Sequence, residues 1–284
     1  TSAPASNGRG QASAANRRAR EHGGNQVASF DRTESDTKML AADKIWVKQI
    51  KAALMENRFR LVQQPIASLV GEDLGMFDVL LRMLDEKGQE VLPSVFMPAA
   101  ERNDLMKNID RWVIGAAMSF CTARKPGALF VRLSQESLSD STLPAWLDNQ
   151  LKITRAEPAR IVFQVREEAA SQLIKDAVAL HQALHKRGFR FAIEGFGLGR
   201  DTEQLLGHLK PDFVKIHGAL MQGLSGDQDK QARVKAMVEL ARGCKAITIG
   251  ERVQDANTMA VLWQLGVEFI QGYFVNAPEE VVLG

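Results

Sequence analysis

Apolar residues follow two alternating patterns from about residue 40 onward. Short runs rich in β-branched and aromatic residues predict strands. Between these runs, apolar positions recur every three to four residues, which predicts amphipathic helices. The eight predicted strands are Phe59–Ser68, Asp78–Met83, Ala128–Leu133, Arg160–Val165, Phe189–Ile193, Asp212–Ile216, Ala246–Ile249 and Glu268–Gln271.

The helical repeat is clearest in three segments, the first of which covers residues 42–57. Gly188 and Gly243 each follow a helical segment, where a residue in the left-handed conformation is favoured and glycine adopts it without strain. The apolar helical positions are Ile45, Val47, Ile50 and Leu54, then Ile109, Trp112, Val113 and Ala116, then Val234, Met237, Val238 and Ala241.

Eight strands alternating with helices over about 245 residues have the size and order of a TIM-type (β/α)8 barrel, an α/β fold. A doubly wound open sheet is the structural alternative, because it also alternates strands with helices. We predict a barrel domain over residues 41–284. Residues 1–40 are predicted to be a linker, because residues 1–16 are rich in Ser, Ala, Asn and Gly and show no hydrophobic period.

Composition and charge restrict the classes of partner. The 284 residues carry a net charge of +2, which is too small to indicate a nucleic-acid or membrane partner. Residues 1–32 hold five arginines against two acidic residues; a nucleic-acid arm is one interpretation and a solvated linker is the favoured one. No apolar run reaches the roughly 18 residues of a membrane span. Cys121 and Cys244 predict two buried free thiols and a cytoplasmic protein.

Polar residues recur at or near the ends of the predicted strands, where barrel enzymes place their functional groups. Arginine and lysine side chains can bind phosphate oxygens, and amides and carboxylates can read base edges. The flat apolar side chains of Pro93, Phe96, Tyr273 and Phe274 can stack on a purine or, alternatively, pack in the core. The polar set comprises Gln64, Arg82, Arg132, Gln164, Glu194, Lys215, His217, Glu251 and Gln271.

Ordered motifs over residues 40–280 make the chain resemble the EAL phosphodiesterase domain. Individually these motifs are weak, but their joint order and spacing are specific. The matching segments are Gln64-Pro65-Ile66, Asp78-Val79-Leu80-Leu81-Arg82 in place of E-A-L-L-R, Leu92-Pro93 with Phe96-Met97-Pro98 and Ala100-Glu101, Asp110-Arg111-Trp112-Val113, Phe196-Gly197 with Gly199, Asp212-Phe213-Val214-Lys215-Ile216, and Gln271-Gly272-Tyr273 with Pro278.

The resemblance implies a pocket for cyclic di-GMP at the barrel mouth and, in the family, hydrolysis with Mg²⁺ or Mn²⁺. The positions that match the family's ligand contacts are Gln64, Leu80, Arg82, Pro93, Phe96, Asp110, Glu251, Gln271, Tyr273, Phe274 and Pro278. The positions that match its metal-binding and catalytic residues are Asp78, Arg132, Gln164, Glu194, Gly195, Lys215, His217 and Gln254.

Several family carboxylates are changed at those positions, and Mg²⁺ requires hard anionic oxygen ligands. Asp78 replaces Glu, Gln164 replaces the first Glu of E-I-T-E, and Arg132 replaces a ligand Asn. We therefore expect no bound metal or other cofactor and a receptor that is not an enzyme. A slow metal-dependent phosphodiesterase and an interaction scaffold that binds no nucleotide are the alternatives.

The resemblance also implies a wider context. Residues 17–27 resemble the last helix and strand of a GGDEF domain, which implies a GGDEF–EAL protein; a linker is the alternative. The departures at the metal positions resemble those of EAL domains that regulate type IV pili. That likeness implies a PilZ-domain partner and, beyond it, the pilus assembly machinery.

Overall fold

The computed structural model describes residues 32–280, so the GGDEF-like segment 17–27 and most of the predicted linker lie outside the described residues. The chain divides into two compact units, Thr1–Gln49 and Ile50–Gly284. Helix α2 spans Arg32–Met55 and begins ten residues before its predicted start. The predicted start was wrong because residues 32–41 lack an apolar period, yet they also lack the glycine or proline that would interrupt a helix.

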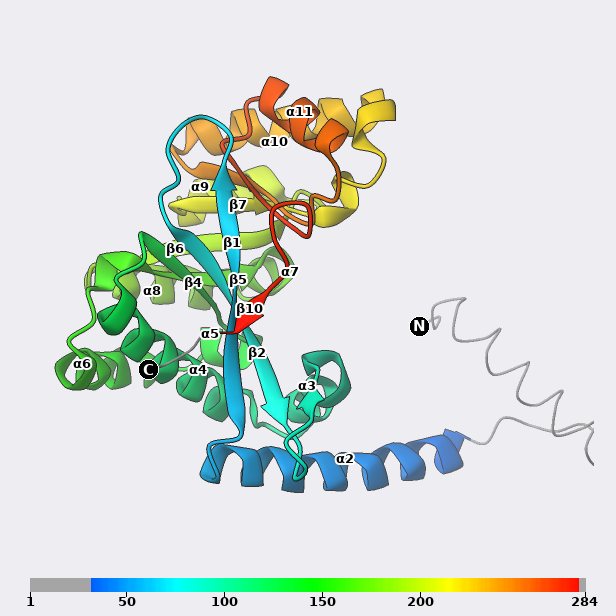
Figure 1. Cartoon of the computed structure of the whole chain (residues 1–284), viewed down its shortest axis with the longest axis vertical. Coiled ribbons are helices and arrows are strands. Elements are labelled where there is room, and N and C mark those ends of the chain that lie inside the picture. Colours follow the sequence, from blue (N-terminus) through cyan, green and yellow to red (C-terminus); the bar gives the residue numbers. More distant parts are fainter. Residues whose placement is uncertain (1–31, 281–284) are drawn as a thin grey trace, which may run out of the picture. The chain divides into compact units, whose positions relative to one another are not determined.

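Eight strands of the described chain form a closed barrel, which confirms the predicted fold (Figure 1). The strand order is β1-β9-β8-β7-β6-β5-β4-β2, and pairing of β1 with β2 closes the sheet. All eight lie within a few residues of their predicted bounds. The strands are β1 Phe59–Ser68, β2 Met76–Leu84, β4 Ala128–Arg132, β5 Ile161–Arg166, β6 Arg190–Phe196, β7 Phe213–Ile216, β8 Ile247–Gly250 and β9 Phe269–Gln271.

Strand β1 runs antiparallel to both of its neighbours, whereas the remaining barrel pairs are parallel. Residues 69–75 join β1 to β2, and a connection this short permits only an antiparallel pair. Gln64 therefore lies in the middle of its strand, paired with Asp78. Two short strands, β3 (Glu90–Val91) and β10 (Glu279–Glu280), extend the sheet and were not predicted.

Helices surround the barrel and connect its parallel strands (Figure 1). Gly188 has the predicted positive φ, 82°, whereas Gly243 lies inside α10 and Lys245, with φ 61°, takes the left-handed position. No described helix is both long and apolar enough to cross a membrane. The helices are α3 Pro93–Arg102, α4 Met106–Arg124, α5 Gln135–Leu138, α6 Leu143–Thr154, α7 Glu167–Gln172, α8 Ile174–His185, α9 Thr202–Leu209, α10 Gln228–Gly243 and α11 Ala256–Gln264, with 3₁₀ turns η1 Pro158–Arg160, η2 Gly218–Leu220 and η3 Leu224–Gly226.

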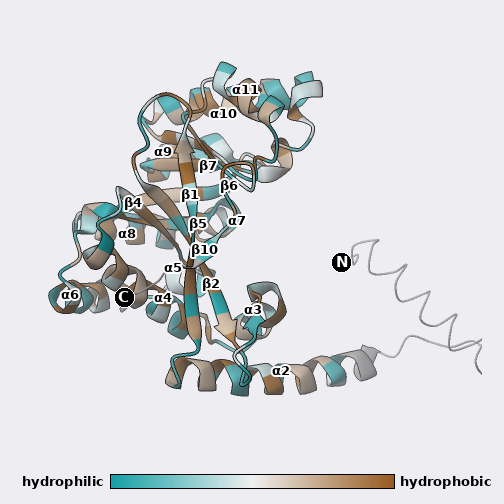
Figure 2. Cartoon of the chain, viewed as in Figure 1, coloured by the Kyte–Doolittle hydropathy of each residue, from teal (hydrophilic) through white to brown (hydrophobic). Residues whose placement is uncertain are grey.

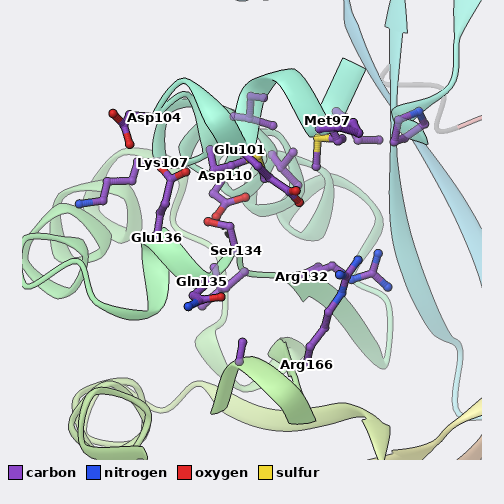
Figure 3. A pocket seen from close by; sticks show the side chains of 18 of the residues that line it. Met97, Glu101, Asp104, Lys107, Asp110, Arg132, Ser134, Gln135, Glu136 and Arg166 are labelled. Carbon is purple, nitrogen blue, oxygen red and sulfur yellow. Dashed lines mark hydrogen bonds between the residues drawn. The ribbon is translucent and has the colours of Figure 1, made fainter. Parts of the chain in front are cut away.

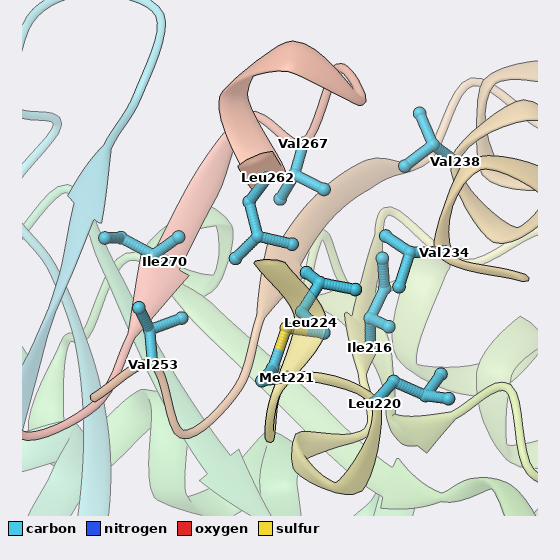
Figure 4. Packing of buried hydrophobic residues seen from close by; sticks show 10 residues of the cluster. All are labelled: Ile216, Leu220, Met221, Leu224, Val234, Val238, Val253, Leu262, Val267 and Ile270. Atoms are coloured by element: carbon cyan, nitrogen blue, oxygen red, sulfur yellow. The ribbon is translucent and has the colours of Figure 1, made fainter. Parts of the chain in front are cut away.

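Among the described residues, two apolar clusters pack inside and outside the barrel sheet. One fills the interior at the amino ends of the parallel strands and includes Phe130, Phe213 and Phe269. The other packs α10, α11 and the 3₁₀ turns onto the outside of the sheet and includes Val238 and Leu262 (Figure 4). The strands are correspondingly apolar, and polar residues concentrate on exposed helix faces and loops (Figure 2). The first cluster closes one end of the barrel and leaves the other for polar side chains.

Candidate functional site at the barrel mouth

A layer of buried polar side chains lies directly above the apolar interior. Because side chains alternate across a strand, the residue two positions after an interior apolar residue also points inward. Asp78 follows Met76 in this way, and Gln164 follows Val162. Asp78, Gln164 and Lys215 are buried, Gln164 and Lys215 completely. The ammonium of Lys215 lies 4.7 Å from the centre of the Phe130 ring, so the polar layer rests on the apolar one.

Asp78 is the centre of a hydrogen-bond network within this layer. Its Oδ2 accepts from Lys215 Nζ at 2.8 Å and from Gln271 Nε2 at 2.8 Å, and its Oδ1 accepts from Gln164 Nε2 at 2.7 Å. Gln271 Nε2 also contacts Gln64 Oε1 at 3.0 Å, and Gln271 Oε1 accepts from Lys215 Nζ at 3.1 Å. The carboxylate is thus satisfied by one cation and two amides. Burial by itself raises the pKa of Asp78, but Lys215 and Arg132 outweigh it and hold the pKa below its usual value.

A second ion pair lies beside the network. Arg132 ends β4 and forms a bidentate pair with the buried carboxylate of Glu194, with Nε–Oε1 and Nη2–Oε2 distances of 2.5 and 2.6 Å. Glu194 strongly raises the pKa of Arg132, so the guanidinium stays charged. Charge-assisted forks of this kind are strong and geometrically specific. The pair neutralises both groups at the opening of the barrel.

Glu251 follows β8 and is an acidic group of the mouth whose pKa is strongly raised. Burial raises its pKa to about 7; Lys215 and Arg132 oppose this rise, while Glu194 and Asp78 reinforce it. The side chain is half-buried. A carboxyl group whose pKa lies near neutrality can accept or donate a proton under physiological conditions.

The raised pKa of Glu251 predicts a pH-dependent effect of Glu251→Gln on stability. Between pH 4.5, the pKa of the Glu251 carboxyl group in the unfolded chain, and about 7, its pKa in the folded protein, the folded protein binds one more proton than the unfolded chain. The contribution of Glu251 to stability therefore falls as the pH rises through that interval. We expect the variant to match the unsubstituted protein at pH 4, below both pKa values, and to exceed it by about 1–2 kcal/mol at pH 8, less than the full shift because the side chain is only partly buried. Urea unfolding at both pH values measures this difference, and a variant that is less stable at pH 8 would contradict it.

Two adjoining cavities open above the polar layer. The larger has a volume of about 1230 Å³ and lies between β2, α3, α4 and the ends of β4 and β5 (Figure 3). The smaller, about 760 Å³, lies over the ends of β5, β6 and β8. Arg132 and Arg166 line both cavities, so the two form one continuous opening at the carboxyl ends of the parallel strands.

The structure brings about half of the predicted ligand contacts to these cavities. Leu80, Arg82, Pro93 and Asp110 line the larger one, and Glu251 lines the smaller one. The amides of Gln64 and Gln271 belong to the buried network beneath them. Arg82 is paired with Glu90 at 2.9 Å, and Asp110 accepts a bond from the backbone N–H of Ser134 at 2.8 Å.

The predicted aromatic ligand contacts do not line either cavity. Phe96 is completely buried, and its ring centre lies 6.0 Å from that of Phe59, so it packs in the core, as the alternative interpretation held. Tyr273 and Phe274 lie after β9 with 73% and 41% of their surfaces exposed. Pro278 also lies outside both cavity walls. Tertiary packing decides which face of a helix or turn meets a cavity, and sequence order does not contain that information.

Most positions that match the family's metal-binding residues do converge. Asp78, Gln164 and Lys215 form the buried network, and Arg132, Glu194, Gly195 and His217 line the smaller cavity. Burial and the neighbouring Arg252 lower the pKa of His217, whose Nδ1 accepts a bond from the backbone N–H of Ala219. Gln254 is exposed and does not join them, because the adjacent Val253 is the residue that packs inward.

The converging residues do not fit a divalent metal ion. Within the described chain, no group of three or more His, Cys, Asp or Glu side chains is arranged to hold one. Asp78 is bound by Lys215 and Glu194 by Arg132, so protein cations occupy the carboxylates that a metal would need. At an effective dielectric of about 20, like unit charges 4 Å apart repel by roughly 4 kcal/mol. The cations of Lys215 and Arg132 would therefore repel a divalent ion placed beside these carboxylates.

Two residues near the mouth were missed by sequence reasoning. Arg166 lies two positions after Gln164 on the same face of β5, and that alternation was the signal that could have identified it. Glu167 accepts three backbone N–H bonds, from Gly197, Leu198 and Gly199, at 2.9–3.2 Å. A Cβ atom at Gly199 would lie 2.9 Å from that carboxylate, so a larger residue there would displace the Glu167 side chain from these bonds. No sequence pattern pairs Glu167 with this loop.

Comparison with known proteins places this architecture in a family. A model of the EAL domain matches residues 47–278. The chain belongs to the EAL domain family. As an EAL domain, it resembles the crystal structure of the FimX EAL domain from Pseudomonas aeruginosa bound to c-di-GMP, with a TM-score of 0.79 and 36% identity over 82% of this chain and 96% of that one. The FimX EAL domain of Xanthomonas citri in complex with c-diGMP gives a TM-score of 0.79 and 28% identity over 88% and 98% of the two chains.

Curated relatives correct one prediction. Cyclic di-GMP phosphodiesterase PdeF of Escherichia coli is 28% identical over 84% of this chain, and cyclic di-GMP phosphodiesterase PdeB of Shewanella oneidensis is 27% identical over 92%. The EAL domain spans about a third of the length of these relatives, 32% and 31%. The prediction that the chain is not an enzyme is wrong, because these relatives are named phosphodiesterases. It rested on exchanged carboxylates alone, and such exchanges do not by themselves determine a reaction rate.

Proposed function

We propose that this EAL domain binds cyclic di-GMP in the opening above the polar layer. The observation that supports the proposal is a cavity of about 1230 Å³ whose wall contains Arg82, Arg132 and Arg166. Its volume is somewhat larger than that of most small-molecule pockets. Guanidinium groups bind phosphate oxygens through parallel N–H bonds, and the ligand carries two phosphodiesters. The FimX EAL domains of similar fold were solved with this nucleotide.

We also propose that this binding requires no divalent metal ion. Lys215 and Arg132 hold positive charge beside Asp78 and Glu194, where a metal would otherwise supply it. Isothermal titration with cyclic di-GMP should give the same dissociation constant in EDTA and in excess Mg²⁺. An affinity that falls by tenfold or more in EDTA would overturn this part of the proposal.

Arg82→Ala is expected to weaken cyclic di-GMP binding by about 1.5–3 kcal/mol, the range for a hydrogen bond to a charged group. In the unliganded domain the guanidinium contacts Glu90 and the carbonyl of Leu81, which uses two of its five N–H donors. Isothermal titration measures the loss, and Arg60→Ala, outside both cavities, is the control. Unchanged affinity in Arg82→Ala would contradict a phosphate contact there. Failure of the unsubstituted domain to bind would favour the scaffold interpretation.

Hydrolysis of cyclic di-GMP is the second candidate function. It is favoured by the named phosphodiesterases among the relatives and by Glu251, whose pKa of about 7 suits a group that takes a proton from an attacking water. Attack would break one P–O ester bond and yield linear pGpG. Chromatography after incubation with Mg²⁺ or Mn²⁺ tests this function. Turnover that Glu251→Gln abolishes would establish it, and product equally abundant without the protein would refute it.

We extend the proposal to the partner and compartment that the resemblance implies. A PilZ-domain protein would bind the nucleotide-loaded domain and connect it to the pilus assembly machinery; similarity to two FimX EAL domains supports this. Co-elution of a purified PilZ-domain protein only when cyclic di-GMP is present would test it. Cys121 and Cys244 are free thiols, Cys121 buried and Cys244 partly buried, which supports a reducing, cytoplasmic location.

A further inference from the structure

Arg166 occupies a distinctive position in the opening. It is the last residue of β5, it lines both cavities, and 66% of its side chain is exposed. In the sheet, Arg166 is paired with Glu194 of the neighbouring strand β6. On the other side of β5, Arg132 of β4 is paired with Gln164, so Arg166 lies two residues further along the strand. Figure 3 shows the guanidinium groups of Arg132 and Arg166 extending toward the same side of the larger cavity.

Three other cations at the mouth already have acidic partners. Arg132 is bidentate to Glu194, Lys215 contacts Asp78 at 2.8 Å, and Arg82 contacts Glu90 at 2.9 Å. For Arg166, the nearest carboxylate contact is Nε to Glu194 Oε1 at 3.9 Å, longer than a hydrogen bond.

That carboxylate is already engaged by Arg132 through both oxygens. The described residues supply no hydrogen bond to the guanidinium of Arg166. The positive charge of this side chain is therefore less compensated than those of Arg82, Arg132 and Lys215.

We propose that Arg166 binds a phosphate group of the nucleotide at the junction of the two cavities. This inference rests on the proposed binding of cyclic di-GMP and identifies a contact that the family motif does not contain. In E-I-T-E, the residue that corresponds to Arg166 is threonine, since Gln164-Val165-Arg166-Glu167 occupies those four positions. A hydroxyl offers one donor and no charge, whereas a guanidinium offers a planar fork that matches a phosphate.

The same geometry gives the two phosphodiesters of the ligand separate cations. Arg82 lies on β2 and lines the larger cavity alone, whereas Arg166 lies where that cavity meets the smaller one. Burying phosphate charge is costly unless it is paired, and Arg132 is already neutralised by Glu194. Arg166 thus supplies the charge that the second phosphate requires without breaking an existing hydrogen bond.

Isothermal titration of cyclic di-GMP with Arg166→Gln tests this inference. We expect the dissociation constant to rise at least tenfold and its dependence on salt concentration to become weaker, because one screened phosphate contact is lost. Arg166→Lys should recover part of the affinity, since it keeps the charge and loses the fork. Arg242→Gln makes the same change of charge at an exposed position of α10 outside both cavities, and should bind as the unsubstituted domain does.

Thermal unfolding of each variant without ligand separates binding from folding, and the midpoints should agree within a few degrees. An Arg166→Gln variant that keeps the affinity of the unsubstituted domain overturns this inference and leaves the proposed function standing. Equal weakening in Arg242→Gln also overturns it, because net charge would then be the cause. If the unsubstituted domain fails to bind, the proposed function and this inference fall together.

Discussion

Lys215→Met is expected to lower the free energy of unfolding by about 3–5 kcal/mol at pH 7, the range for removing one partner of a buried ion pair. Lys215 is fully buried, and its ammonium contacts Asp78 at 2.8 Å and Gln271 at 3.1 Å. Methionine fills a similar volume but leaves the carboxylate of Asp78 without a neighbouring cation in the network. Urea unfolding followed by circular dichroism measures the loss.

The double variant Lys215→Met/Asp78→Asn is the control for this effect. An asparagine at position 78 removes the uncompensated charge and keeps side-chain atoms able to bond Gln164 and Gln271. We expect the double variant to regain most of the lost stability. The deficit of the single variant should also shrink toward pH 4, because the carboxyl group of Asp78, no longer held ionised by Lys215, can take up a proton. A deficit below about 1 kcal/mol, or one that is constant with pH, would contradict the role given to this pair.

Arg132→Asn is expected to lower the free energy of unfolding by about 1–3 kcal/mol in metal-free buffer, less than for a fully buried pair because 44% of the Arg132 side chain is exposed, and to create a response to Mn²⁺. The substitution leaves the buried carboxylate of Glu194 without its bidentate partner and places the family's ligand type at position 132. Carboxylates freed from a neighbouring cation attract a divalent ion. Bound metal at one hundred times its dissociation constant would restore about 2.7 kcal/mol.

Differential scanning calorimetry with and without Mn²⁺ measures this response. Arg132→Lys keeps the positive charge and should respond no more than the unsubstituted domain. A midpoint that rises equally with Mn²⁺ in the unsubstituted domain would show that Arg132 does not exclude a metal. That outcome would also remove the argument for metal-independent ligand binding, because the two rest on the same ion pair.

Local patterns in the chain were sufficient to predict the barrel and its polar layer. The eight strands could be located because β-branched and aromatic runs alternate with helical repeats. The polar layer could be anticipated because Asp78, Gln164 and Lys215 interrupt strands that are otherwise apolar. Motif order then indicated the family that the comparison confirmed.

The local sequence pattern could not predict which side chains of the site contact one another. Phe96, a predicted ligand contact, is completely buried and its ring packs near that of Phe59, which the sequence pattern did not indicate. Arg82 and Glu90 lie eight residues apart and pair only because β3 folds back on β2. The contact of Glu167 with the loop after β6 likewise depends on the pairing of β5 with β6.

By itself, the sequence determined which residues are strands, which of their faces point inward and which side-chain chemistry lies there, since these follow from backbone periodicity and residue type. The tertiary structure alone decided that β1 runs antiparallel, that Arg132 and Lys215 bind Glu194 and Asp78, and that Arg166 lies at the junction of two cavities. These features depend on the register of strands distant in sequence. Charges of opposite sign pair according to their separation in space, and closure of the barrel sets that separation.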